Sequence, residues 1–395
     1  MSRGKPEAYT ERNRVALINT GHAYFQRMEA LIDGAQQAVH LQVYILADDE
    51  TGARVGNALV RAARRGVLVY LLVDGYASRD LPKALVEELR TAGGHVAWFE
   101  PIWRSRHFYV GRRMHHKVLV VDHRFGLVSG RNIADRYMDR PGEPAWYDIA
   151  VDVEGEVVAD LERLCCQLWN ARPERVRTGR AVPPTAAEVE AMFKNWPANE
   201  RCAVRVRFND WLRHRSEITR SYAAMFQAAR SEVWLISSYF VPGHFFKRML
   251  SRAVRRGVRV VLVTSGHSDV LIAKPAERWL YAWLLRRGVE VYEYQGPVMH
   301  AKVAARDDEW CTAGSFNVND LSTYTTLEVN LDVNDRKVGK HLGQVVDGIA
   351  LHECRRITAE EEGHVGPLTK LGRWLAYQAL RISHTLVTSY YHRER

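Results

Sequence analysis

Two histidines with matching polar neighbours stand far apart in the chain. His115 is followed by a lysine, an aspartate and an asparagine, and His300 is followed by the same residue types at the same distances. The separation between corresponding residues is 185 in every case (300 − 115, 302 − 117, 307 − 122 and 317 − 132). This common register predicts one site assembled from two similar halves. The two sets are His115, Lys117, Asp122 and Asn132, and His300, Lys302, Asp307 and Asn317.

Two histidines and two lysines from related half-sites suit displacement at phosphorus. The lysines and asparagines would hold the phosphoryl oxygens and neutralise the charge that develops in the transition state. One imidazole would attack phosphorus and form a covalent phospho-histidine. The other would protonate the leaving alcohol and then deprotonate the incoming one. Neither step requires a metal ion, so the sequence predicts no metal or other cofactor, and a chelator is not expected to inhibit.

Each imidazole also needs a carboxylate on its far nitrogen, which fixes its tautomer and orientation. Asp122 and Asp307 stand an odd seven residues after the histidines, so a strand would point them to the opposite face. We therefore expect these two aspartates to be structural. Asp148 and Glu328 are better candidates, because they stand 33 and 28 residues after the histidines of their own halves (148 − 115 and 328 − 300), on the next predicted strands.

Both motifs resemble the paired His-Lys-Asp signature of the phospholipase D superfamily, and both copies are complete. The resemblance covers roughly Val39–Val333. Within the superfamily, the chain most resembles bacterial cardiolipin synthases of the short type without N-terminal spanning helices. The supporting stretches are Asp48–Gly52, Arg64–Val67, Tyr239–Pro242, Gly288–Tyr294 and Gly314–Asn317.

The resemblance implies that the histidine, lysine and asparagine of both halves meet at the interface of the halves. It implies that Asp148 and Glu328 orient the histidines and that Asp122 and Asp307 are structural. The histidine of the N-terminal half is usually the nucleophile in this family, so the resemblance assigns attack to His115. It leaves the acid and base steps to the histidine of the second half.

Two serines beside the asparagines, Ser129 and Ser315, are predicted to contact the substrate. The chain departs from the family pattern nearby, because Ser129-Gly130 stands where a Gly-Gly or Gly-Ser pair is usual. Residues 319–322 also lack the arginine that commonly precedes the serine. Neither departure removes a reacting group, and both fall among the predicted substrate contacts.

The activity implied by the resemblance is phosphatidyl transfer. A phosphatidyl group would pass from phosphatidylglycerol, or a related donor, to His115 and then to the hydroxyl of a second phospholipid headgroup, giving cardiolipin. Water as acceptor would make the chain a phospholipase D hydrolase. A nuclease or phosphodiesterase with the same two histidines is the alternative enzyme. A non-enzymatic binding protein is a third reading, which two intact motifs disfavour.

Alternating strand and helix patterns surround both motifs. Helices are predicted over His22–Ala38, Gly56–Arg65 and Leu81–Ala92, with apolar strands over Val39–Leu46, Val67–Val73 and His95–Phe99. His115 and Lys117 are expected on one face of a further strand. The same order recurs in the second half, where Arg64–Val67 reappears as Arg255–Val258 with a shift of 191.

These patterns predict an α/β fold, a duplicated phospholipase D-type α-β-α sandwich. Each of its two pseudo-symmetric halves would hold a mixed, mostly parallel sheet. The predicted organisation is a first domain over residues 1–170, a linker over 171–203 and a second domain over 204–350. A C-terminal extension would occupy residues 351–395. Prolines at 173, 183, 184 and 197 mark the linker, with a short helical piece near Ala186–Phe193.

Composition favours an anionic partner. The net charge of the chain is +10 and its pI is 9.4, which suits either an acidic membrane surface or nucleic acid. The chain carries no added nucleic-acid module, so the predicted partners are an anionic phospholipid substrate and the membrane surface. No obligate protein partner is inferred. No run approaches the ~18 apolar residues of a spanning helix, and the N-terminal residues lack a signal-peptide core, so we expect a peripheral protein at the cytoplasmic face.

Two further features complete the prediction. The five cysteines are odd in number and show no metal-ligand spacing, so they are interpreted as reduced and structural. The tail predicts a basic amphipathic helix with an apolar face and a face of basic residues and Tyr377. Such a helix either packs on its own domain or contacts a membrane interface, and its removal would weaken liposome binding in the second case. The apolar face is Leu368, Leu371, Leu375, Ala379, Ile382 and Leu386, and the other is Lys370, Arg373, Tyr377, Arg381 and His384.

Overall fold

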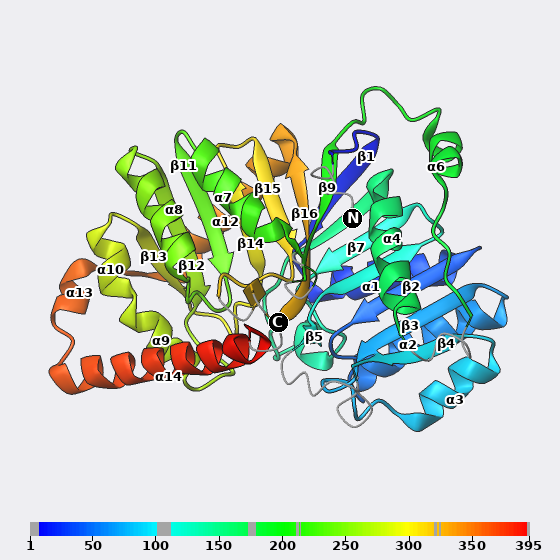
Figure 1. Ribbon diagram of the computed structural model, residues 1–395, viewed down its shortest axis with the longest axis horizontal. Coiled ribbons are helices and arrows are strands. Elements are labelled where there is room, and N and C mark those ends of the chain that lie inside the picture. The colour runs from blue at the N-terminus through cyan, green and yellow to red at the C-terminus, as the bar shows by residue number, and fades with distance from the viewer. Residues whose placement is uncertain are drawn as a thin grey trace.

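The computed structural model describes residues 8–100, 112–172, 179–210, 213, 215–319, 322–323 and 325–392, with the backbone alone over residues 383–392. The first seven residues, on which part of the signal-peptide prediction rests, and Pro173 of the predicted linker lie outside this set. In the described part, two α/β halves lie side by side (Figure 1). The first half is blue to teal and the second green to orange.

The first half is built on a sheet whose described strands run in the order β1, β8, β7, β6, β2, β3 and β4. Three helices cover one face of this sheet and α4 covers the other. The central strands are buried along almost their whole length, as expected of strands covered on both faces. The elements are β1 Asn13–Ile18, α1 Gly21–Gly34, β2 Ala38–Val43, α2 Glu50–Arg64, β3 Leu68–Asp74, α3 Lys83–Thr91, β4 His95–Phe99, β6 Lys117–Val121, β7 Phe125–Ser129, η1 Asp135–Tyr137, β8 Ala150–Gly155 and α4 Val157–Asn170.

The second half repeats this plan. Its described strands run in the order β10, β9, β16, β15, β14, β11, β12, β13 and β17, and the short strand β5 from the first half pairs with β16. The strands are β5 Arg113–Met114, β9 Ala203–Asp210, β10 Arg215–Ser216, β11 Glu232–Ser237, β12 Arg259–Ser265, β13 Glu290–Tyr294, β14 Lys302–Arg306, β15 Trp310–Gly314, β16 Thr326–Asn334 and β17 Cys354–Ile357. The helices are α7 Glu217–Ala228, α8 His244–Arg255, α9 Ala273–Trp279, α10 Tyr281–Arg286 and α12 Arg336–His352.

Both sheets are mixed, and their parallel part is smaller than the alternating pattern predicted. The parallel ladders join β2 to β3 to β4 and β11 to β12 to β13, where helices cross between the strands. The strands of the motif regions pair antiparallel, β6 with β7 and β14 with β15. The reason is local: only a few residues connect these strands, and a parallel pair needs a crossover of a dozen or more residues.

A shared core joins the halves. One buried apolar cluster contains α4, α12 and the faces of both sheets that these two helices cover. Two further clusters lie on the outer faces, one under α1, α2 and α3 and the other under α7, α8, α9 and α10. Because the inner cluster contains side chains from both halves, folding of each half is coupled to its docking on the other.

Several predicted boundaries differ from the structure. Helix α1 ends at Gly34 and not at Ala38, which begins β2, because the Asp122 carboxylate accepts hydrogen bonds from the backbone N of residues 36–38 and fixes a turn there. Helix α2 begins at Glu50, six residues before the predicted start, because the Asp49 carboxylate accepts a hydrogen bond from Gly52 N and caps the helix. His115 was predicted inside a strand, but it lies between β5 and β6, and the ladder begins at Lys117. The equivalent strand β14 likewise begins at Lys302. Each histidine thus lies just before a strand begins, and its backbone is free to form hydrogen bonds outside that strand's ladder.

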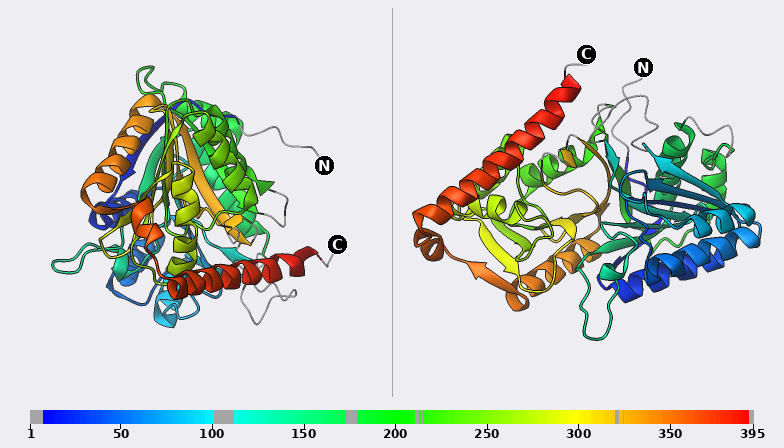
Figure 2. Two further views of the ribbon diagram at one scale, coloured as in Figure 1. Left: turned by 90° about the vertical axis from the view of Figure 1, so that its left-hand side faces the viewer. Right: turned by 90° about the horizontal axis from the view of Figure 1, so that it is seen from below.

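Three helical segments lie outside the two halves, one between them and two after the second half. Helix α6 (Ala186–Phe193) lies in the predicted linker, as expected, and begins with a capping box of Thr185 and Glu188. Helices α13 (Ala359–Gly363) and α14 (Pro367–His392) follow the second half, and α14 runs as a straight rod along its outer edge (Figure 2). No helix in the described residues is long and apolar enough to cross a membrane. The domain limits at 170, 203 and 350 stay a prediction.

Candidate active site

Backbone pairing between the halves delivers both histidines to one place. Strand β5, just before His115, pairs in parallel with β16 of the second half, and His115 N donates to Leu327 O at 3.0 Å. The reciprocal pairing occurs before the other histidine. Tyr147 N donates to Val298 O at 2.8 Å, and His300 N donates to Tyr147 O at 2.7 Å. In each half, the segment that precedes the histidine therefore pairs with a segment of the other half. That partner segment is the one that precedes the other half's acidic residue.

As a result, the carboxylates are exchanged between the halves. His115 Nδ1 lies 3.0 Å from Glu328 Oε1, and His300 Nδ1 lies 2.7 Å from Asp148 Oδ2. The sequence-based assignment of each acid to the histidine of its own half is thus wrong. The physical reason is the reciprocal strand pairing, which the spacing within one half does not reveal. The four residues are nevertheless brought together as two histidine–carboxylate pairs.

The pairs fix the tautomer of both rings. A carboxylate that accepts from Nδ1–H leaves the Nε2 lone pair free for attack on phosphorus or for proton transfer. The side chain of His115 is 19% exposed and that of His300 is 8% exposed. The Nε2 atom of His300 also lies 3.4 Å from the Tyr137 hydroxyl. Of the two rings, His115 is the one more open to an incoming phosphodiester.

Burial and positive charge favour the neutral form of both imidazoles. Burial lowers the pKa of His115, and burial together with Lys302 and Lys117 lowers the pKa of His300 well below its ordinary value. Burial raises the pKa of Asp148 to about 6, against the lowering effect of Lys302. Burial acts to raise the pKa of the Glu328 carboxyl, but His115, Lys117 and Ser315 together outweigh it and lower that pKa.

The two lysines are buried, and each donates a hydrogen bond to the backbone oxygen of the histidine of its own half. Burial lowers the pKa of Lys117 to about 7 and that of Lys302 to about 8, and each of Asp148 and Glu328 acts in the opposite direction on both. Lys117 Nζ donates to His115 O at 2.5 Å, and Lys302 Nζ donates to His300 O. Two ammonium groups held this way would bind a phosphodiester anion, and a bound anion would restore their ordinary basicity.

The asparagines occupy different surroundings. Asn132 Nδ2 donates to the Tyr137 hydroxyl at 3.1 Å, and its Oδ1 accepts from Ile45 N at 3.2 Å. Asn317 is also buried, but its Oδ1 has no hydrogen-bond partner in the described residues. The amide of Asn132 is therefore already engaged by the protein, whereas the carbonyl oxygen of Asn317 is not.

Both predicted substrate-contacting serines are fully buried. Ser129 Oγ accepts from Arg131 N at 2.9 Å. Ser315 Oγ donates to Glu328 Oε2 at 2.5 Å, so it helps to hold the carboxylate that orients His115. Direct contact of either serine with substrate stays a prediction.

The two motif aspartates act on the backbone instead. Asp122 accepts hydrogen bonds from Gln36 N, Gln37 N and Ala38 N at 2.7 to 3.0 Å. Asp307 accepts from the equivalent segment of the second half, from the backbone N of residues 230, 231 and 232. Both therefore fasten the turn before a central strand, β2 or β11, which is the geometry expected of structural residues.

The sequence reasoning missed two residues that contact the lysines. Lys117 Nζ lies 5.2 Å from the centre of the Tyr44 ring, and Lys302 Nζ donates to Ser238 Oγ at 2.9 Å. Tyr44 follows the last residue of β2 and Ser238 follows the last residue of β11, so they hold equivalent places. Their separation is 194 (238 − 44), so a search at the offset of 185 could not pair them.

Gly130 tests how tightly the Asp148 pair is packed. A Cβ atom at this position would lie 2.5 Å from Asp148 Oδ2 and 3.1 Å from Lys302 Cδ. We expect Gly130→Ala to displace the carboxylate and to lower kcat by about 10²-fold, the usual cost of misplacing a catalytic group by about an ångström. Gly34→Ala is the matched control, because no atom lies within 4 Å of its added Cβ. Unchanged kcat in Gly130→Ala would show that Asp148 does not need this position.

Comparison with known proteins shows the family of the chain. A family model described as cardiolipin synthase, PLD-like domain, matches residues 28–169 and 222–349. The chain is 36% identical over 360 residues to cardiolipin synthase B of Salmonella typhimurium, covering 88% of this chain and 83% of that protein. It is 34% identical over 363 residues to cardiolipin synthase B of Escherichia coli K12, covering 89% and 83%.

Two solved structures share the fold. Phosphatidylserine synthase of Haemophilus influenzae Rd KW20 superimposes with a TM-score of 0.70 at 15% identity, covering 95% of each chain. Polyphosphate kinase of Porphyromonas gingivalis gives 0.59 at 15% identity, covering 94% of this chain and 53% of that one. At such identities the likeness concerns the fold alone.

The duplicated fold and its two half-sites define an enzyme of the phospholipase D superfamily. Because the family model matches more than half of the chain and the relatives exceed 30% identity over most of it, the chain belongs to the cardiolipin synthase family, whose enzymes are of the phosphatidyltransferase type.

Proposed function

We propose that the protein transfers a phosphatidyl group from phosphatidylglycerol, or a related donor, to the headgroup hydroxyl of a second phospholipid. His115 Nε2 attacks phosphorus, the bond to the glycerol oxygen breaks, and His300 gives that oxygen a proton. The same ring then removes the proton of the incoming hydroxyl, which displaces His115 and yields cardiolipin. The observation that supports this scheme best is the exchange of carboxylates, since it gives one site two oriented imidazoles.

Charge at the site changes when the substrate binds. Burial and the positive charge of Lys302 and Lys117 lower the pKa of His300. A phosphodiester anion between Lys117 and Lys302 cancels part of that positive charge and so raises the pKa of His300. Protonated His300 is therefore favoured only when the substrate, with its leaving group, is bound. The two ammonium groups then stabilise the additional negative charge of the transition state.

A product assay tests the proposed reaction. Protein incubated with phosphatidylglycerol, with and without phosphatidylethanolamine, should form cardiolipin and free glycerol, measured by mass analysis of the lipids. Phosphatidic acid as the main product would indicate the hydrolase alternative. Digestion of plasmid or single-stranded DNA in parallel, with no lipid product, would indicate the nuclease alternative. The His115→Ala/His300→Ala protein is the blank for every arm.

We further propose that α14 attaches the protein to an anionic membrane surface. The helix packs on its own domain through the face that carries Tyr377, whose hydroxyl accepts from Lys247 Nζ at 2.9 Å, and Arg373, which pairs with Glu362 at 2.8 Å. The predicted apolar face points outward instead. The described side chains of that face are exposed, namely Leu368, Leu371, Leu375, Ala379 and Ile382, and Trp374 is exposed beside them.

A groove of about 520 Å³ lies between this helix and the rest of the second half. Phe245 and Phe246 give it apolar walls, and Arg220 and Lys247 give it positive charge. The groove also includes Val241, whose backbone pairs with Val318 beside Asn317. An apolar stripe on α14 next to a basic groove suits the interface of an anionic bilayer.

Point substitutions test this attachment without removing the packing face of the helix. We expect Leu371→Ser/Leu375→Ser to weaken binding to phosphatidylglycerol vesicles by about tenfold or more, measured by vesicle co-sedimentation. The reason is that each leucine buried in the membrane contributes about 1.5–3 kcal/mol at most. Val182→Ser removes an exposed apolar side chain on the segment between the halves and is the matched control. Equal binding of all three proteins would assign α14 to intramolecular packing alone.

A further inference from the structure

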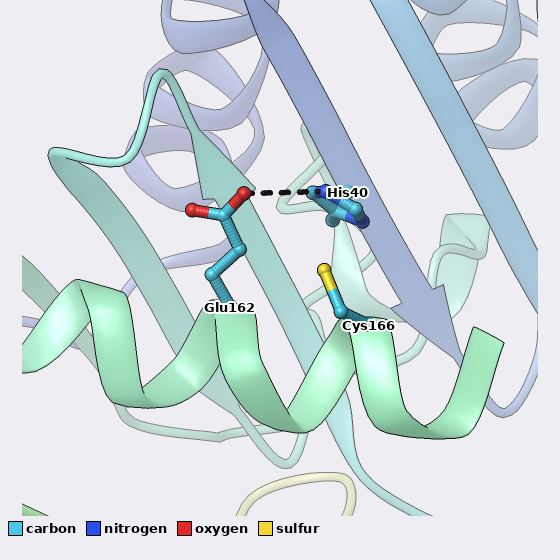
Figure 3. A group of neighbouring side chains, drawn as sticks. All are labelled: His40, Glu162 and Cys166. Carbon is cyan, nitrogen blue, oxygen red and sulfur yellow. Dashed lines mark ion pairs between the residues drawn. The ribbon is translucent and has the colours of Figure 1, made fainter. Parts of the chain in front are cut away.

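A second group of chemically active side chains lies in the first half, on the inner face of its sheet. His40 on β2 points toward α4, from which Glu162 and Cys166 point back (Figure 3). One donor atom from each of the three residues lies within 4.8 Å of the others, and all three residues are buried, with exposures of 2%, 0% and 2%. Glu162 and Cys166 are four residues apart, so one helical turn places them on the same face.

The donor atoms of this cluster are incompletely satisfied. Glu162 Oε1 lies 3.4 Å from His40 Nε2 and has no hydrogen-bond partner in the described residues. His40 Nδ1 also lacks a partner there. Burying polar atoms without a hydrogen-bond partner is unfavourable, and a cation bound by these atoms would offset that cost.

The other carboxylate oxygen is held from outside. His123 Nδ1 lies 2.6 Å from Glu162 Oε2, which fixes the carboxylate and leaves Oε1 directed at the cluster. The His40 ring is held as well, because it stacks on Tyr70 with 4.7 Å between the ring centres. Ligand residues held by outer contacts of this kind are typical of metal sites.

We propose that His40, Glu162 and Cys166 form a structural binding site for Zn²⁺. Imidazole, carboxylate and thiolate together are a donor set that zinc accepts, at about 2.0–2.3 Å from the metal, and three protein ligands leave one position of the tetrahedron for a further ligand. Hard cations such as Mg²⁺ and Ca²⁺ prefer oxygen ligands and are poor candidates.

Zinc binding would break the S–H bond of Cys166. An ordinary cysteine thiol carries its proton at neutral pH, and zinc binds the thiolate form. The metal would replace that proton, which passes to solvent, and would form the bond to sulfur. The ion would tie the centre of the first sheet to α4, and therefore to the core that joins the two halves. It takes no part in the reaction at the histidines.

The adjacent cysteine supplies a matched control. Cys165 is buried one residue earlier on the same helix and is not part of the cluster. We expect wild-type protein and Cys165→Ser to hold about one Zn²⁺ per chain after incubation with zinc and gel filtration, measured by elemental mass spectrometry. Cys166→Ser should hold almost none. Reconstitution with Co²⁺ should give sulfur-to-cobalt absorption in the first two proteins and not in the third.

Three outcomes would overturn the proposal. The first is that wild-type protein holds no zinc after incubation. The second is that Cys166→Ser holds as much zinc as wild type, which would indicate an adventitious ion only. The third is a cobalt spectrum without the sulfur band. If Cys166→Ser does not fold, His40→Gln removes another of the three proposed ligands and replaces it in the test. The cobalt spectrum of the wild-type protein also tests the proposal without any variant. Chelation should lower the unfolding temperature of wild type and leave that of folded Cys166→Ser unchanged.

Discussion

Replacing either His115 or His300 by alanine should lower turnover of phosphatidylglycerol by at least about 10⁴-fold, because a nucleophile or a general acid and base is lost. The two variants should differ when the leaving group is 4-nitrophenol, which departs without protonation. His300→Ala should then release one equivalent of nitrophenol in a burst, since His115 can still attack. His115→Ala should release none, and absorbance in a stopped-flow experiment measures both.

The control is His364→Ala, which removes an exposed histidine just after α13 whose ring Nδ1 hydrogen-bonds to Glu360 O. This variant should turn over phosphatidylglycerol at the wild-type rate. Circular dichroism must show that both active-site variants are folded, because both rings lie at the interface of the halves and their loss could destabilise it. Full activity in either active-site variant would contradict a site that needs two histidines.

Replacing Asp148 by asparagine should reproduce the defect of the histidine in the opposite half. Asp148→Asn keeps the size of the side chain but removes the charge that orients His300, so phosphatidylglycerol turnover should fall by about 10³- to 10⁴-fold while the nitrophenol burst remains. Glu328→Gln should impair the burst itself, because Glu328 orients His115. Pairing within one half predicts the reverse.

Double variants sharpen this comparison. Adding Asp148→Asn to His300→Ala should cost little more than His300→Ala alone, since the carboxylate acts through the ring that has already been removed. Adding it to His115→Ala should instead lower residual activity further. Equal effects in both backgrounds would mean that Asp148 acts on the site as a whole and not through His300.

Much of this site could be predicted from the sequence because the repeated residues keep one offset. The membership of both half-sites follows from types and spacing, and the structural use of Asp122 and Asp307 was expected from strand periodicity. The exchange of Asp148 and Glu328 could not be predicted. It depends on which strand edge lies beside each histidine, and that is decided by packing between residues more than 150 positions apart.

The remaining differences also have tertiary causes. The tail was predicted to be an amphipathic helix, but periodicity does not say which face of the helix packs on the protein. In the structure, Tyr377 and Arg373 contact Lys247 of α8 and Glu362 of α13, and these contacts hold the polar side inward. The cysteines showed no ligand spacing because the cluster draws on positions 122 and 126 residues apart (162 − 40 and 166 − 40). Only the fold brings His40 to Glu162 and Cys166.

The most direct measurement of the central claim is the mass of the trapped intermediate. His300→Ala protein, mixed with the 4-nitrophenyl ester of phosphatidic acid and digested, should carry one phosphatidyl group on the peptide that contains His115, since attack can occur but the incoming alcohol is not deprotonated. Nitrophenol release without any adduct, or an adduct on a residue other than His115, would contradict the proposed relay between the two histidines.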